Sequence, residues 1–138
     1  MIAYVDSSVL LRLALGQRNA MSQWRQVARG VSSALIATES LRTLDRLRIR
    51  AGLSDLEVAS RRATILSLIG SLELIEVDSV VLDRAAQPMP TELGTLDSIH
   101  LASALLWKDA MGIDPVMVTH DGALGLAAQA HGLKVIGT

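Results

Sequence analysis

The chain alternates short apolar runs with longer segments of helical periodicity. Strands are predicted where β-branched or nearly all apolar residues cluster, because strands covered on both faces lack polar alternation. The predicted strands are 2–5, 33–37, 73–77, 116–119 and 134–136. Helices are predicted near 8–15, 20–29, 39–51, 55–69, 79–86, 95–111 and 122–131. This alternation predicts an α/β domain with a central parallel sheet of four to five strands between helical layers.

Local signals place several of the predicted boundaries. Gly52 ends the helix of 39–51, and Ser54 with Glu57 forms a capping box that starts the next helix. The segment 87–90 contains two prolines and is expected to be an irregular connection. No repeat or interdomain linker interrupts the pattern, so residues 1–138 are predicted to form a single domain.

Composition narrows the chemistry and the environment. The chain has no Cys, which excludes disulfides, thiolate nucleophiles and Cys-based metal sites. The apolar run 99–107 is far shorter than a bilayer-crossing helix, which needs about 20 residues. Asp6 interrupts the first apolar run, so no signal peptide is expected. We therefore expect a cytoplasmic protein without a membrane segment.

The net charge of −1 conceals an uneven distribution of charges. Residues 12–62 hold ten Arg and four acids, whereas the remainder holds three basic and ten acidic residues. A basic flank beside an acidic edge suits a polyanion guided toward a metal ion. The alternative is an ion-paired, solvated helical surface, and composition alone leaves both interpretations open.

Four carboxylates recur at predicted strand exits or helix starts: Asp6, Glu39, Asp97 and Asp121. Parallel α/β sheets bind ligands just beyond the carboxyl ends of their strands. Any one of Glu39, Asp97 or Asp121 could simply cap a helix, whereas Asp6 follows a buried-looking strand and is harder to explain in this way. Four at one edge would repel each other unless they met a cation or took up protons. Oxygen-only ligation indicates Mg²⁺ or Mn²⁺ rather than zinc.

Five fragments carry a family resemblance that covers nearly the full length of the chain. They are Tyr4–Leu11, Ala37–Arg42, Leu96–Ala104, Val118–Leu124 and Ala130–Val135. In this order and spacing they resemble the PIN-domain ribonucleases, especially the VapC-type toxins of type II toxin–antitoxin pairs. The resemblance implies a PIN-like three-layer α/β/α fold and an acidic pocket that binds Mg²⁺ or Mn²⁺.

Matched residue by residue, the four carboxylates fall on the acidic quartet of that family. The resemblance implies that Asp6 and Asp97 are the main metal ligands and that Glu39 completes the pocket and helps to position water. The role of Asp121 varies most across such enzymes, so a direct metal contact is left open.

Other polar residues near these acids have competing interpretations. Thr119 matches the family's hydroxyl before the last acid, and Ser7 or Ser8 matches its small polar residue after the first. Thr119 and Ser7 could equally cap adjacent backbone. Arg42 could contact phosphate or pair with an acid. His100 is expected to be a packed core residue rather than a ligand.

The resemblance implies a metal-dependent endoribonuclease that leaves 5′-phosphate and 3′-hydroxyl ends. It also implies a cognate antitoxin and a homodimer. The sequence does not specify which RNA is cut. Arg42, Arg46 and Arg50 follow one another at four-residue spacing, and such a row of arginines does not identify bases. One alternative is a Mg²⁺-dependent phosphoryl-transfer or receiver-like domain, although Asp6 lacks a neighbouring acid and Lys134 is poorly placed for it. The other alternative is a non-catalytic PIN-like domain that binds RNA or protein.

Overall fold

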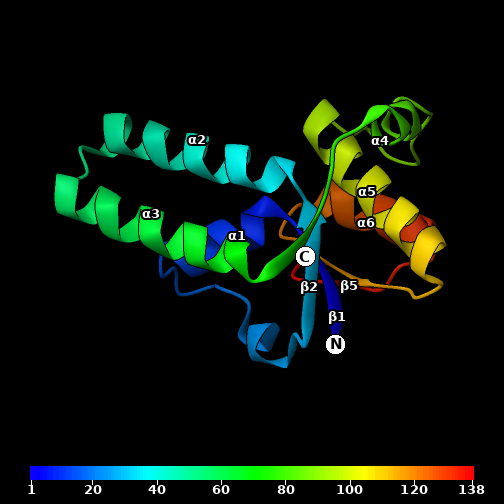
Figure 1. Ribbon diagram of the computed structural model, residues 1–138, viewed down its shortest axis with the longest axis horizontal. Coiled ribbons are helices and arrows are strands. Elements are labelled where there is room, and N and C mark those ends of the chain that lie inside the picture. Colours follow the sequence, from blue (N-terminus) through cyan, green and yellow to red (C-terminus); the bar gives the residue numbers. More distant parts are fainter.

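A five-stranded parallel sheet runs through the middle of the molecule, in the strand order β3-β2-β1-β4-β5 (Figure 1). The computed structural model describes residues 1–138. The strands are β1 Ile2–Val5, β2 Arg29–Ser33, β3 Leu72–Ile75, β4 Val116–Val118 and β5 Val135–Ile136. The helices are α1 Ser7–Ala14, the 3₁₀ helix η1 Ser22–Gln26, α2 Leu35–Ala51, α3 Asp55–Gly70, α4 Ser79–Ala85, α5 Thr95–Met111 and α6 Gly122–Ala130. The predicted α/β architecture with a parallel sheet is confirmed.

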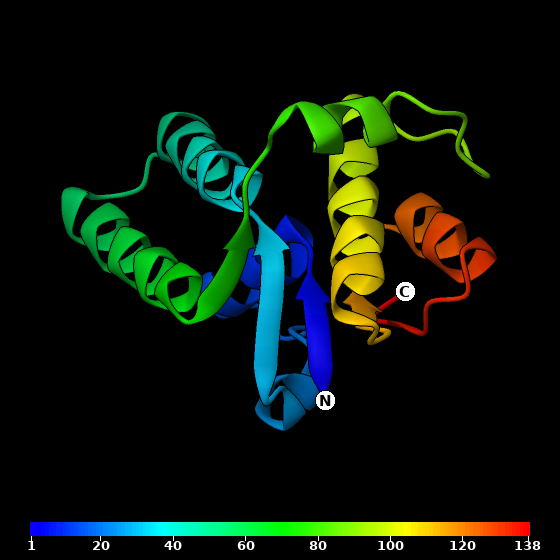
Figure 2. The ribbon, with the colours of Figure 1, turned by 45° about the vertical axis from the view of Figure 1, so that its right-hand side comes forward.

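Alternate residues of the central strands enter two separate cores, because successive strand side chains point to opposite faces. Ala3 and Val5 of β1 pack with α1, α2 and α3 on one face. Tyr4 between them packs with α5 and α6 on the other face, together with Val31 and Met117 from the neighbouring strands. Figure 2 shows α2 and α3 on one side of the strands and α5 and α6 on the other. The sheet is therefore the middle of three layers.

Helices α2 and α3 form an antiparallel pair that extends away from the sheet (Figures 1 and 2). Gly52 ends α2 in the left-handed conformation, with φ of 63°. Glycine adopts this conformation without the steric cost of a Cβ atom. The hydroxyl of Ser54 accepts the backbone N–H of Glu57 at 3.2 Å, and this cap begins α3. Both sequence-based boundaries are confirmed.

The predicted position of the second strand is wrong. The strand lies earlier in the chain than predicted, because the residues after Ser33 begin a helix. Residues 33–37 were expected in the sheet, but β2 lies at Arg29–Ser33 and pairs with β1 through Arg29, Gly30 and Val31. The hydroxyl of Ser33 accepts the backbone N–H of Leu35 at 3.1 Å, and the apolar run continues as the first turn of α2. The helix predicted over 20–29 is correspondingly reduced to η1.

Helix α2 begins at Leu35, four residues before its predicted start at 39, and the other elements depart from their predicted bounds by at most two residues at either end. The helix over 95–111 is confirmed to the residue. The third strand ends at Ile75 rather than at residue 77, because Asp78 already caps α4 by accepting the N–H of Val81 at 2.9 Å. None of the helices combines the length and the apolar character needed to cross a membrane.

Candidate functional site

The carboxyl ends of the two central strands bring Asp6 and Thr119 together. β1 ends at Val5 and β4 at Val118, so the residues that follow emerge at one edge of the sheet. The backbone N–H of Asp6 donates to the carbonyl of Val118 at 3.0 Å, which extends the pairing beyond both strands. The pairing of β1 with β4 therefore brings the side chains of Asp6 and Thr119 into contact, although the two residues are 113 positions apart in sequence.

The side chain of Asp6 is held by hydroxyl groups, and the residue is only 3% exposed. Ser8 Oγ donates to Asp6 Oδ2 at 2.6 Å, and Thr119 Oγ1 donates to the same oxygen at 2.9 Å. Ser7 Oγ lies 3.5 Å from Oδ1, at the limit of a hydrogen bond. The accessory hydroxyls predicted from the sequence thus touch the first acid, with Ser8 and Thr119 as its close partners.

Asp121 and Thr119 also have the capping roles that an ordinary helix start requires. Asp121 Oδ1 accepts the N–H of Leu124 at 2.9 Å and caps α6. Thr119 Oγ1 accepts the N–H of Asp121 at 2.9 Å while it donates to Asp6. Thr119 therefore caps adjacent backbone and contacts Asp6 at once, because one hydroxyl both accepts and donates.

Glu39 and Asp6 are neighbours through a buried imidazole. His100 Nε2 lies 2.5 Å from Glu39 Oε1 and 3.9 Å from Asp6 Oδ1. Glu39 reaches this point from the second turn of α2 rather than from a strand exit, which corrects its predicted local setting. Asp97 stands in the first turn of α5, one turn before His100 on the same helix.

The pKa of Asp97 is affected by the three other acids. Burial raises the pKa of Asp97 to about 6, the charges of Asp121, Asp6 and Glu39 raise it as well, and His100 opposes them. Asp97 therefore lies within electrostatic range of the other three acids. None of the four forms an ion pair with a Lys or Arg side chain.

The one cationic partner available to this cluster is His100. Burial lowers the pKa of His100, but the hydrogen bond with Glu39 and the negative charges of Asp6, Glu39 and Asp97 outweigh burial and raise it above the ordinary value. The negative charges of three carboxylates act on this single imidazole, so the site keeps an excess of negative charge.

The donor set fits a hard divalent cation. It consists of carboxylate and hydroxyl oxygens, and its uncompensated charge is what a dication would neutralise. No three of the chain's Asp, Glu and His side chains are drawn together into a ready-made ion cage. Mg²⁺ usually takes one or two carboxylates and keeps several waters, so a closed protein cage is not required.

A cleft of about 240 Å³ opens beside these acids. Its lining includes Glu39 and the neighbours of two other acids, Ser7 and Leu96, and two arginines of α2 stand on its wall, Arg42 and Arg46. Arg42 also pairs with Asp45 at 3.0 Å on the exposed surface of α2. The predicted pairing of Arg42 with an acid is thus present, but with an acid outside the cluster.

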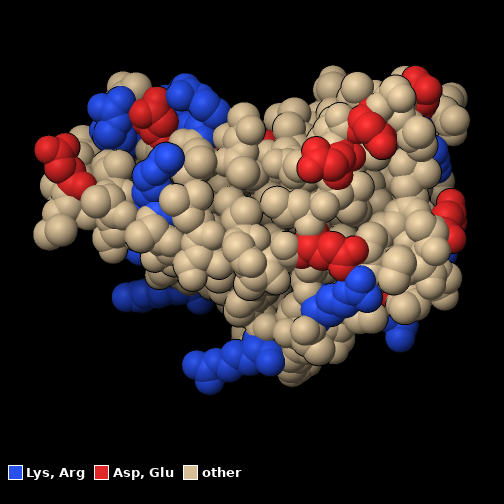
Figure 3. Space-filling model, in the orientation of Figure 1, with Lys and Arg blue, Asp and Glu red and all other residues tan.

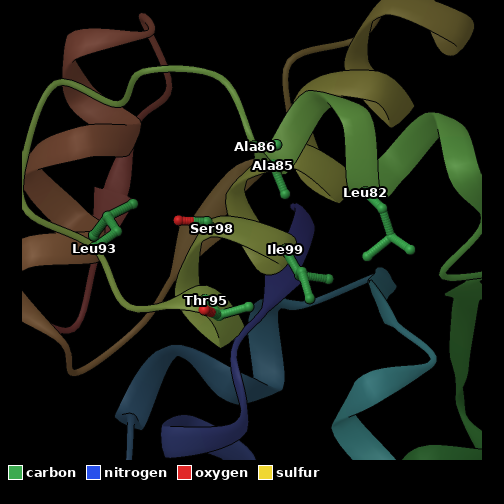
Figure 4. A pocket seen from close by; sticks show the side chains of 7 residues that line it. All are labelled: Leu82, Ala85, Ala86, Leu93, Thr95, Ser98 and Ile99. Atoms are coloured by element: carbon green, nitrogen blue, oxygen red, sulfur yellow. The ribbon is translucent and has the colours of Figure 1, made fainter.

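A second cavity lies over the start of α5 and is chemically different. Figure 4 shows the side chains around it, among them Leu82 of α4, Leu93 of the preceding connection and Ile99 of α5. Its volume is about 310 Å³, and no Asp, Glu, His, Lys or Arg lines it. It offers no charged group to a metal or to a phosphate, so the acidic edge remains the candidate site.

Sequence reasoning missed the role of His100. It was expected to be a packed core residue and is fully buried, yet both of its ring nitrogens bond to polar groups. Its position one turn after Asp97 was the available signal, but no local pattern shows that Tyr4 and Glu39 lie beside it. His120 is partly buried, with Nδ1 2.7 Å from the carbonyl of Gly137.

Comparison with known proteins agrees with this geometry. The family model described as "PIN domain" matches residues 3–124. Ribonuclease VapC46 of Mycobacterium tuberculosis is 36% identical over 137 residues, which cover 96% of this chain and 95% of that protein. Ribonuclease VapC35 of the same species is 30% identical over 140 residues, which cover 96% of this chain and 94% of that protein. The chain therefore belongs to the PIN-domain family.

Proposed function

We propose that this protein is a divalent-metal-dependent endoribonuclease and the toxin of a toxin–antitoxin pair. The observation that carries the proposal is the cluster of four carboxylates at the carboxyl edge of the sheet, with no Lys or Arg paired to it. Its full-length similarity to two proteins named as VapC ribonucleases supports RNA as the substrate class. Membership of the PIN-domain family leaves the receiver-like alternative without support.

Asp6 and Asp97 would hold Mg²⁺ or Mn²⁺, with Glu39 and Asp121 completing the coordination directly or through water. Such an ion supplies a more acidic bound water and neutralises charge that develops on the scissile phosphate. The protein's contribution is to fix these oxygens in advance. Ser8 and Thr119 both donate to Asp6 Oδ2, so this carboxylate is oriented before any ligand binds.

Glu39 is the residue best placed to accept a proton from an attacking water. Its side chain is 14% exposed and lines the cleft, so it borders both the buried acids and the open side of the site. A carboxylate in hydrogen-bond reach of the water can act as a general base. The leaving oxygen departs as the 3′-hydroxyl, and the new bond leaves a 5′-phosphate on the other fragment.

RNA would approach along the arginine wall of the cleft. Figure 3 shows Lys and Arg side chains over α2 and α3 and acidic side chains over α4. Arg42 and Arg46 are four residues apart and so follow one side of α2 toward Glu39. Contacts of this kind bind the phosphate backbone and position the strand without reading its sequence.

The acidic site also suggests how an antitoxin could bind. A cognate antitoxin that inserts an Arg could satisfy the carboxylates in place of metal, since a planar guanidinium binds carboxylates bidentately. We further propose that the enzyme acts in the cytoplasm and as a homodimer.

The test is cleavage of a mixed RNA pool by the purified protein with Mg²⁺, followed by sequencing of the new 5′ ends. We expect cleavage that stops with EDTA and is lost in Asp97→Asn while the fold is retained. Asp109→Asn is the matched control, because Asp109 is exposed near the other end of the same helix. Cleavage that persists with EDTA would refute metal dependence, and retention in Asp97→Asn would refute the assigned site. A folded protein that binds RNA without cutting it would support the non-catalytic alternative.

A further inference from the structure

His100 lies at the junction of the sheet core and the acidic edge. The residue is fully buried, on α5. Its Nδ1 is 2.9 Å from the hydroxyl of Tyr4, a fully buried residue of β1, and its Nε2 is 2.5 Å from Glu39 Oε1 on α2. The rings of Tyr4 and His100 meet edge to face, with centroids 5.9 Å apart. One imidazole thus joins a strand and two helices.

These contacts matter because Glu39 has no other hydrogen-bond partner within the protein. The only side-chain bond that Glu39 forms is the one with His100 Nε2. Glu39 has a flexible side chain and lies on α2 between the exposed Thr38 and the buried Ser40. Without the imidazole it would be free to turn into the cleft or toward the arginines.

The direction of the hydrogen bond does not depend on the charge of the ring. In neutral His100, the Tyr4 hydroxyl can donate to Nδ1, which leaves the proton on Nε2 for Glu39. In protonated His100, both nitrogens donate, and the Tyr4 oxygen accepts. Nε2 is therefore the donor to Glu39 in both forms, because an ionised carboxylate can only accept, and the Tyr4 hydroxyl can donate or accept as the ring requires.

We propose that His100 is a positioning residue that holds the Glu39 carboxylate at the acidic edge, with Tyr4 fixing the imidazole. This inference rests on the proposed function, since Glu39 matters only if the acidic edge performs chemistry. Through Glu39, His100 sets the direction of the oxygen that receives the water's proton. Its effect is expected on the turnover step and not on RNA binding.

Two amide substitutions separate the bond to Glu39 from the bond to Tyr4. The side-chain nitrogen of Gln can occupy the place of Nε2, and that of Asn the place of Nδ1. We expect His100→Asn to lower kcat for RNA cleavage by about 10- to 100-fold, the usual effect of losing a supporting bond at a metal site. KM for RNA should stay unchanged, and His100→Gln should recover most of the lost kcat. His131→Asn, at the end of α6, is the control.

The Glu39→Gln background shows whether His100 acts through Glu39. If it does, Glu39→Gln/His100→Asn should cleave no more slowly than Glu39→Gln alone, because residues that act as a unit are not additive. Tyr4→Phe keeps the buried ring and loses only the hydroxyl, so it should lower kcat by about fivefold, equivalent to one hydrogen bond of ~1 kcal/mol. This variant preserves the core if the His100 variants fail to fold.

The contact can also be observed without RNA or metal. In EDTA, NMR of ¹⁵N-histidine-labelled protein should show a His100 Nε2 proton protected from exchange, and that signal should shift in Glu39→Gln. Absence of the proton, equal kcat in the Asn and Gln variants, or additive losses in the double variant would each overturn the positioning role. Failure of wild-type protein to cleave RNA while the NMR signal is present would instead refute the proposed function.

Discussion

Asp97→Asn should stabilise the metal-free protein above about pH 6 while it abolishes cleavage. The pKa of Asp97 is raised from its ordinary value of 3.8 to about 6, first by burial and then by the neighbouring acids. The folded state therefore binds this proton more tightly than the unfolded chain does. As pH rises from about 4 to about 6, the wild type loses stability, and above that range the loss stays constant.

The size of the effect follows from the shift in the pKa of Asp97. Each pKa unit corresponds to about 1.4 kcal/mol. The wild type therefore forgoes at most about 3 kcal/mol of unfolding free energy at pH 7.5. Asp97 is only partly buried and lies in the first turn of α5, where solvent screening and the helix dipole both reduce the gain from neutralising it. We expect a net stabilisation of about 1–2 kcal/mol at pH 7.5, and almost none near pH 4.

Urea denaturation in EDTA at both pH values measures this difference. Glu57→Gln is the matched control, because Glu57 occupies the same position in the first turn of α3 and is exposed. It should lose a few tenths of a kcal/mol to about 1 kcal/mol at pH 7.5 through the helix dipole. Adding Mg²⁺ at about 100 times its dissociation constant should raise wild-type stability by about 2.7 kcal/mol and leave Asp97→Asn unchanged. An Asn variant less stable than wild type at pH 7.5, or equally stabilised at both pH values, would refute the reasoning.

Three further substitutions test other parts of the structure. Thr119→Val removes the donor to Asp6 and should cost about 1–3 kcal/mol in thermal unfolding and slow cleavage; an unchanged melting temperature would contradict this role. Ser54→Ala removes the cap of α3 and should cost about 1 kcal/mol with kcat unaffected, and a loss of kcat would show that α3 acts on the site. Arg46→Gln should raise KM and reduce the slope of log affinity against log salt by about one, whereas Arg50→Gln should do neither; equal effects would argue against the cleft as the RNA path.

Much of the fold was predictable because local and long-range signals agree. The helix of 95–111 has an apolar interior and the left-handed Gly112 at its end, so its bounds were found from the sequence. β2 was misplaced because the run 31–37, apolar apart from Ser32 and Ser33, suits either a strand or a helix. Its register is set by pairing of residues 29–31 with β1, a tertiary contact that no local pattern reports.

The grouping of the acids was predictable from sheet geometry, but the connections among them were not. Asp6 and Asp121 follow parallel strands, and such strands end at one edge. The burial of His100 was predicted, but its bonds to Tyr4 and Glu39 were not, because these partners are 96 and 61 residues away. From sequence alone, a histidine within an apolar helical run is predicted to be a core residue. Only the folded structure shows that a carboxylate lies beside it.

The central position of β1 has a consequence for the order in which the sheet can form. β1 ends at Val5 and pairs on one side with β4, which begins only at Val116. Until that segment emerges, one edge of β1 has no partner, and such long-range pairing makes folding slow. A chain without β4 cannot join Asp6 to Thr119, so the acidic edge cannot assemble before β4 pairs with β1.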